Sequence, residues 1–353
     1  PGLQVVVARK GKVIYQKSFG NHTYESSQNV TNTDVYDIAS LTKIIATLPN
    51  VMQEFDQGHL TLETKLKTML PEAKNSNKAN ATVLDMLTHQ ARFQPWIPFY
   101  KATLDSLNRP STHYYRSEFS EEFPIHVADK LYLRKDYNDS IVKTILDSEL
   151  LPKKQYKYSD FTFILFKEYL ELHSKKSLEE LAHTNFFEPL GANSIMYNPL
   201  RKMNSNRIIP TENDTYFRHQ VIQGYVHDMA AAMQGGISGH AGLFANALDV
   251  AKVMQMYLQK GTYGGRTYIS ENTFNMFNTC YFCKEGNRRG VGFDKPQLGN
   301  EGPTCGCVSL TSFGHTGFTG TMTWADPEKE IVYVFYHRYH YIKRHDVDRL
   351  HYY

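Results

Sequence analysis

A serine and a lysine three residues apart could form an activated nucleophile near the start of the chain. In the segment from Val35 to Thr47, an extended run ends in a small residue, Ser40 opens an expected helix, and Lys43 follows. Residues three apart share a helix face, so the lysine amine can reach the serine hydroxyl. A serine needs an adjacent base, and a lysine can serve once burial lowers its pKa towards neutrality. At a helix start, backbone N–H groups would also face any oxyanion formed there.

This spacing is not specific by itself. In a chain of 353 residues it should occur by chance about once or twice, and a second copy stands at Ser140 and Lys143. The alternative for any such pair is an N-cap serine followed by a solvated lysine. Other motifs must therefore decide between the two copies.

The composition is that of an ordinary globular protein. Hydrophobic residues make up 41% of the chain, charged residues make up 21%, and the net charge is +3 without a block of like charges. This balance favours neither nucleic acid nor a membrane surface as a partner. The 24 tyrosines suit a carbohydrate- or peptide-binding cleft, and they equally suit tyrosines at the edge of the core.

The chain has no initiator methionine and no signal-like apolar segment, and Pro1-Gly2 leads straight into an apolar run. We therefore expect a fragment of a longer chain. The four cysteines stand as two close pairs, Cys280 with Cys283 and Cys305 with Cys307. Disulfides, a structural metal and free thiols are all compatible with these spacings, and we expect no catalytic role for them.

The pattern of apolar and turn residues predicts strands at both ends and helices between them. Expected strands cover 3–8, 13–19, 290–293, 312–317, 321–325 and 331–335, and expected helices cover 40–58 with a kink at Pro49, 81–89, 138–150, 161–172, 177–187 and 248–259. Residues 90–122 lack periodicity and predict a long surface excursion. The fold class is therefore α+β, with an antiparallel sheet completed by N- and C-terminal strands and an inserted helical region. We expect one domain over 1–353, its sheet part at about 1–38 and 262–353 and its helical part at about 39–261.

Three short motifs stand in a fixed order along the chain: Ser40-x-x-Lys43, Tyr158-Ser159-Asp160 and His315-Thr316-Gly317. This order resembles the serine penicillin-recognising family, which includes class C β-lactamases, D-alanyl-D-alanine peptidases and related esterases. The segments 84–89, 188–191 and 242–250 resemble further stretches of that family. The second serine–lysine pair adjoins Tyr137-Asn138-Asp139 in reversed order, so these two decoys cannot face each other across a cleft.

The resemblance implies a β-lactamase/transpeptidase-like fold and a role for each motif, with no metal or cofactor. Ser40 is then the nucleophile, and Tyr158 relays protons with Lys43 as its partner, its phenol pKa lowered by nearby cations. The backbone N–H groups of Ser40 and Phe318 form the oxyanion hole. Gly317 lets the strand approach the substrate closely.

Two substrate-binding positions depart from the family pattern. Asp160 stands where asparagine is common, and an ionised aspartate only accepts hydrogen bonds. His315, beside Thr316, stands where lysine is frequent, and a histidine is positive only at mildly acidic pH unless its pKa is shifted. His240 either approaches the cleft or caps its glycine-rich loop, the second being favoured. The segment after Tyr336 does not resemble the family's long C-terminal helix.

The expected function is a serine hydrolase that acts through an acyl-enzyme, as an amidase or peptidase on peptidoglycan-derived muropeptides. The resemblance is to the type that in bacteria follows a family 3 glycoside hydrolase domain, which would be an upstream partner in the same chain. It implies a periplasmic or cell-envelope location. An esterase or β-lactamase of the same fold, and a non-catalytic cell-wall binding module, remain as alternatives.

Overall fold

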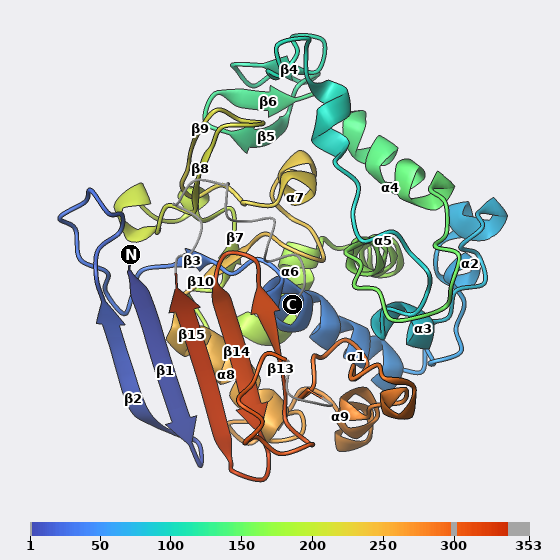
Figure 1. The fold of residues 1–353 in the computed structure, drawn as a ribbon, viewed down its shortest axis with the longest axis vertical. Coiled ribbons are helices and arrows are strands. Elements are labelled where there is room, and N and C mark those ends of the chain that lie inside the picture. Colours follow the sequence, from blue (N-terminus) through green and yellow to red (C-terminus); the bar gives the residue numbers. More distant parts are fainter. Residues whose placement is uncertain (1, 298–301, 338–353) are drawn as a thin grey trace.

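The computed structural model describes residues 2–297 and 302–337 (Figure 1). One large antiparallel sheet has the strand order β13 (Phe313–Gly317), β14 (Thr321–Asp326), β15 (Ile331–His337), β1 (Leu3–Arg9) and β2 (Lys12–Phe19). Strands from the two ends of the described chain therefore pair in its centre, with Val6 opposite Val334. This arrangement confirms the predicted fold class, and it leaves β13 at one edge of the sheet.

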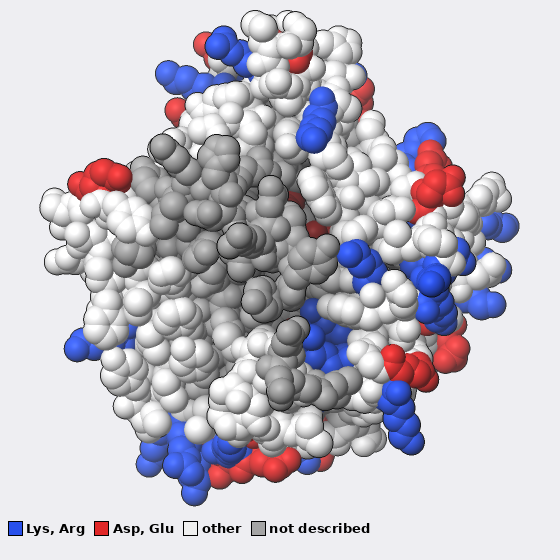
Figure 2. Space-filling view, in the orientation of Figure 1, with Lys and Arg blue, Asp and Glu red and all other residues white. Residues whose placement is uncertain are grey.

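Alternating burial explains why these segments form a sheet with one covered face. Successive residues of β1 alternate between half-buried and buried, as do those of β15, which is the pattern of a strand with one face on the core. Helix α8 (Ala247–Leu258) packs against β1, β14 and β15 on that face (Figure 1). Figure 2 shows basic and acidic side chains intermixed around the rim of one face of the molecule.

The rest of the chain lies beside the β13 edge of the sheet, behind the sheet and beyond one of its ends (Figure 1). Its helices are η1 (Lys43–Thr47, a π-helix), α1 (Leu48–Asp56), α2 (Leu66–Met69), η2 (Pro71–Asn75), α3 (Val83–Leu87), η3 (Phe99–Thr103), α4 (Tyr137–Asp147), α5 (Phe161–Ser174), α6 (Leu178–Ala182), η4 (His183–Phe187, a π-helix), η5 (Pro199–Arg201), η6 (Ser205–Arg207), α7 (Met229–Met233), α9 (Glu271–Asn278) and η7 (Cys283–Glu285). Its short strands are β3 (Tyr36–Asp37), β4 (Tyr115–Arg116), β5 (Ile125–Ala128), β6 (Leu131–Leu133), β7 (Met196–Tyr197), β8 (Glu212–Asp214), β9 (Gln220–Ile222), β10 (Leu243–Ala245), β11 (Thr262–Tyr263) and β12 (Arg266–Thr267). Helix α5 is buried on nearly all sides from Phe161 to Phe166, so it forms the centre of this region.

Two expectations about elements are corrected. The predicted strand at 290–293 is wrong, because its N–H groups bond to the ends of two separate helices, Val291 to the carbonyl of Phe277 in α9 and Gly292 to that of Leu87 in α3. Pro49 lies directly after the π-helix η1, inside a helical run that continues without a break from residue 41 to Asp56. The expected kink at Pro49 stays a prediction.

Residues 90–122 are not simply a surface excursion, because several of their aromatic side chains, Tyr100 and Tyr115 among them, are buried in the main core. Both cysteine pairs form disulfides, Cys280–Cys283 and Cys305–Cys307, which decides between the three states left open. Nearly all of the segment after Tyr336, for which no long helix was expected, lies outside the described residues.

Candidate active site

Ser40 and Lys43 are brought together at the start of the helical region. Strand β3 ends at Asp37, whose carboxylate accepts the N–H of Ala39 at 2.8 Å and so tightens the turn before the serine. Ala39 has φ +45°, a left-handed conformation that non-glycine residues seldom adopt outside special sites. The Nζ of Lys43 donates to Ser40 Oγ at 2.8 Å and to the carbonyl of His240 at 3.1 Å. The predicted pairing of amine and hydroxyl is therefore present.

The charge on Lys43 is controlled by Asp160. Lys43 is fully buried, and its Nζ forms an ion pair with Asp160 Oδ1 at 2.7 Å. Burial by itself lowers the pKa of Lys43, but the ion pair with Asp160 and the adjacent Tyr158 outweigh burial and raise it. The expectation of a lysine pKa lowered towards neutrality is wrong, because the buried amine has a charged partner.

Tyr158 contacts the same serine. Its hydroxyl donates to Ser40 Oγ at 3.1 Å, and Lys43 Nζ lies 5.1 Å from the centre of its ring. Burial raises the pKa of Tyr158, and Lys43 only partly offsets this effect. The predicted lowering of the phenol pKa is therefore wrong, and the protonated phenol acts as a donor.

Strand β13 places the third motif beside these residues. The ring of His315 lies 5.9 Å from that of Tyr158, and only 2% of the residue is exposed. Burial, together with the nearby charges of Arg289 and Lys43, lowers the pKa of His315 to about 3. His315 therefore has the shifted pKa that the sequence left open, and it is a neutral group at the edge strand even at mildly acidic pH.

The residues after His315 are tied to the chain just before Ser40. A Cβ on Gly317 would lie 2.7 Å from the carbonyl oxygen of Ile38, so only glycine permits this approach. The hydroxyl of Thr319 donates to the carbonyl of Asp37 at 2.7 Å. Thr316 is exposed on the strand edge, and Phe318 follows in the turn with 47% of its surface exposed.

A second layer of polar groups surrounds Tyr158 and was not predicted. The guanidinium carbon of Arg289 lies 5.3 Å from the centre of the Tyr158 ring, and the His89 ring lies 4.6 Å away. Arg289 is 5% exposed, donates to Tyr156 at 3.2 Å, and faces Asp294 with 3.7 Å between Nε and Oδ1. The sequence offered no signal for Arg289, since no motif or periodicity links residues 131 positions apart. His89 was noted only as part of a resembling segment.

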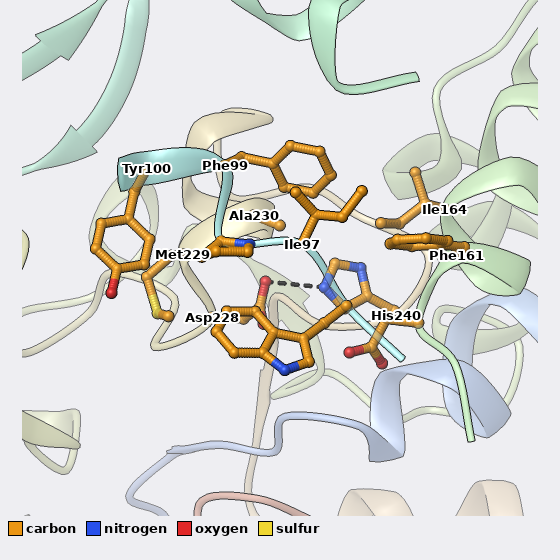
Figure 3. A pocket seen from close by; sticks show the side chains of 12 residues that line it. Ile97, Phe99, Tyr100, Phe161, Ile164, Asp228, Met229, Ala230 and His240 are labelled. Carbon is orange, nitrogen blue, oxygen red and sulfur yellow. Dashed lines mark hydrogen bonds and ion pairs between the residues drawn. The ribbon is translucent and has the colours of Figure 1, made fainter. Parts of the chain in front are cut away.

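A pocket adjoins Asp160 (Figure 3). Its volume is about 320 Å³, including the space at its entrance that is open to solvent. Most of its lining is apolar or aromatic, from residues 96–100, 161, 164, 229 and 230. The polar lining consists of Asp160, Asp228 and His240, and His240 Nε2 lies 2.8 Å from Asp228 Oδ1. His240 also contacts Ser238 Oγ at 2.9 Å within its loop. It therefore both holds the loop and lines the pocket, so each of the two interpretations holds in part.

Comparison with known proteins decides the family. The model of the family described as "Beta-lactamase" matches residues 1–352. The chain belongs to the beta-lactamase family. It is 27% identical to a protein of Escherichia coli K12 provisionally named D-alanyl-D-alanine carboxypeptidase, over 95% of this chain and 77% of the relative. It is 28% identical to the N-acetylmuramyl-L-alanine amidase of Bacillus subtilis 168, over 93% and 74%.

Solved structures of the same fold are more distant in sequence. The hydrolase EstCE1 superposes with a TM-score of 0.67 at 17% identity, covering 95% of this chain and 87% of that one. A class C beta-lactamase from Rhodobacter sphaeroides superposes with a TM-score of 0.61 at 16% identity, covering 97% and 91%. As a beta-lactamase family member with carboxypeptidase and amidase relatives, the chain is a hydrolase.

The second serine–lysine pair lies outside this site. Ser140 and Lys143 are both exposed on α4, and Lys143 pairs with Asp147. In the described part of the chain, no helix is both long and apolar enough to span a membrane.

Proposed function

We propose that the protein hydrolyses amide bonds of peptidoglycan-derived muropeptides through an acyl-enzyme on Ser40. One observation carries the proposal: Ser40 Oγ lies within hydrogen-bond distance of both Lys43 Nζ and Tyr158 OH, at 2.8 and 3.1 Å. A serine with two proton-transfer groups from different elements is the arrangement that nucleophilic acyl transfer needs. The relatives named as carboxypeptidase and amidase support an amide substrate from the cell wall.

Lys43 must lose its proton before it can accept one from Ser40. The ion pair with Asp160 opposes this loss, whereas burial favours it. A substrate N–H group that hydrogen-bonds to Asp160 would weaken the ion pair and leave burial as the dominant influence on the lysine. Substrate binding at Asp160 would therefore lower the pKa of Lys43 and prepare it to act as the base.

Tyr158 would then deliver a proton to the leaving nitrogen. Because its phenol is protonated, it can act as a general acid when the tetrahedral intermediate collapses. The phenolate formed would be stabilised by Lys43 and by Arg289, whose side chains lie 5.1 and 5.3 Å from the ring centre. Arg289 thereby supplies the fixed cation that a lysine at the position of His315 would otherwise contribute.

The oxyanion hole is assigned to the backbone N–H groups of Ser40 and Phe318. Gly317 lies close to Ile38, and Thr319 donates a hydrogen bond to Asp37. These contacts hold the turn after β13 next to the segment before Ser40, as a shared oxyanion hole requires. The exposed edge of β13 at Thr316 would accept the peptide as an added strand.

The pocket supports a substrate that presents hydrogen-bond donors. Its apolar walls carry two acidic residues, Asp160 and Asp228. Burial alone would raise the pKa of Asp228, but pairing with His240 lowers it well below its usual range. An amine or amide N–H of a peptide fits this lining better than a carboxylate does. Because His315 is neutral, it gives no support for recognition of a substrate carboxylate.

The test is product analysis on defined substrates. Purified protein is incubated with muramyl peptides, with an acyl ester of similar size and with a β-lactam, and the products are separated by liquid chromatography and mass spectrometry. We expect Ser40-dependent cleavage of an amide bond in the muropeptide. Turnover confined to the ester or to the β-lactam would assign those activities instead, and binding without turnover of any substrate would make the protein a cell-wall binding module.

A cell-envelope location and an upstream glycoside hydrolase domain complete the proposal. Both described cysteine pairs form disulfides, and disulfides persist mainly in oxidising compartments. The relatives named for cell-wall reactions agree with such a location. Cell fractionation followed by intact-mass measurement of the native protein would test both points, since a cytosolic location, or a mass without room for a second domain, would contradict them.

A further inference from the structure

Three metal-ligating side chains meet on the surface at the far ends of two helices. Glu54 stands in the last turn of α1, His59 follows that helix, and His173 stands in the last turn of α5. Glu54 Oε2 lies 3.2 Å from His59 Nδ1 and 3.5 Å from His173 Nε2, and the two nitrogens are 3.3 Å apart. One oxygen and two nitrogens thus form a nearly equilateral triangle.

The size of this triangle matches one face of a tetrahedral zinc site. With Zn–N and Zn–O bonds of about 2.0–2.2 Å, ligand atoms in a tetrahedron are separated by roughly 3.3–3.5 Å. The three observed separations, 3.2, 3.3 and 3.5 Å, fall in or next to this range. A single ion could therefore contact all three atoms with shifts of a few tenths of an ångström. We propose that Glu54, His59 and His173 bind a divalent transition-metal ion, with zinc as the best fit.

The surroundings hold two of these ligands in place. The hydroxyl of Tyr169 donates to Glu54 Oε2 at 2.9 Å, and its ring stacks on that of His173 with 5.6 Å between ring centres. Outer groups of this kind fix the orientation of ligands and are part of most metal sites. Glu54 is largely buried, with 12% of its side chain exposed, whereas both histidine side chains are 42% exposed. The fourth position of the tetrahedron would therefore face solvent and hold a water molecule.

The position in the fold indicates a stabilising role. Helix α1 continues the segment that carries Lys43, and α5 begins directly after Asp160. At 1.5 Å of rise per residue, His173 lies about 18 Å along α5 from its first residue, so the ion would be remote from Ser40. It would link the ends of the two helices opposite the proposed catalytic groups. The proposal does not rest on the proposed function.

The experiment uses untagged protein that has been treated with a chelator and dialysed. Isothermal titration with ZnCl2 should give one site, and the same titration with MgCl2 should give none, because imidazole ligands favour zinc. At zinc concentrations near 100 times Kd, Tm should rise by a few degrees. His59→Ala and His173→Ala should each weaken zinc binding at least about tenfold. The folding of the two variants, His59→Ala and His173→Ala, can be checked in the absence of metal.

His113→Ala is the matched control, since His113 is an exposed histidine outside the cluster, and it should bind zinc as the wild type does. Absence of zinc binding in the wild type would overturn the proposal. Equal binding by the double variant His59→Ala/His173→Ala would also overturn it, because zinc would then bind elsewhere.

Discussion

At the residue scale, the ion pair between Asp160 and Lys43 determines whether the lysine of the candidate site carries a proton. It holds a proton on a fully buried amine, 2.8 Å from the proposed nucleophile. A sequence motif could place the lysine next to Ser40, but it could not give the charge of the lysine. That charge depends on a contact 117 positions away, between residues whose distance only the fold sets.

Replacing Asp160 by asparagine should move the acid limb of the pH profile. Without the carboxylate, the main cause that raises the pKa of Lys43 is lost, so the neutral lysine forms at lower pH. We expect the acid limb of kcat/KM for a muropeptide to shift to lower pH by at least about one unit. Asp85→Asn, which breaks an ion pair with Lys154 at 2.8 Å that does not involve Lys43, is the control. An unchanged acid limb in Asp160→Asn would exclude Asp160 as the group that sets the charge of Lys43.

His315 should reduce stability at acidic pH. Its pKa is about 3 in the folded protein and about 6.5 when unfolded, so the unfolded state binds more protons and stability falls as pH drops below 6.5. Between pH 7 and pH 5 this difference amounts to roughly 2 kcal/mol. In urea unfolding at the two pH values, His315→Gln should lose about that much less stability than the wild type. His89, whose pKa is also lowered, contributes the same pH dependence of stability to both proteins, so it cancels in the comparison. Equal losses in both proteins would therefore show that His315 does not titrate as described.

At the scale of elements, the site depends on how closely β13 approaches the segment before Ser40. The strands were predictable where burial alternates along them, as in β1 and β15, because one covered face imposes a period of two. The run 290–293 misled the prediction because its backbone partners lie at the ends of two separate helices, α9 and α3. The π-helix η1 was not predictable either, since local propensity does not distinguish it from the expected α-helix.

Gly317→Ala should impair activity more than stability. Its Cβ would lie 2.7 Å from the carbonyl of Ile38, which pushes the edge strand away from Ser40. Misplacing one oxyanion donor typically lowers kcat by about 10²- to 10³-fold, and we expect a loss in that range with a change of a few degrees in Tm. Gly11→Asn, at a turn where no atom lies within 4 Å of the added Cβ, should leave kcat unchanged. Full activity of Gly317→Ala would remove the proposed oxyanion role of this turn.

At the scale of the whole molecule, the fold brings residues 40, 158 and 315 into one site from three distant parts of the chain. The order of their motifs, matched to that of the serine penicillin-recognising family, predicted that they meet, and the same order excluded Ser140, which is exposed on α4. Arg289, Asp294 and the Asp228–His240 pair could not be predicted, because each is defined by burial and by partners from other elements. The disulfide state likewise follows from folded geometry rather than from spacing.

The central claim is that Ser40 is the acylated residue, and covalent labelling tests it most directly. Wild type, Ser40→Ala and Ser140→Ala are incubated with a fluorophosphonate and, separately, with a fluorescent penicillin. Intact mass and peptide mapping then locate any adduct. The account predicts one adduct on Ser40 in the wild type and in Ser140→Ala, and none in Ser40→Ala. An adduct that persists in Ser40→Ala, or that maps to Ser140, would contradict it.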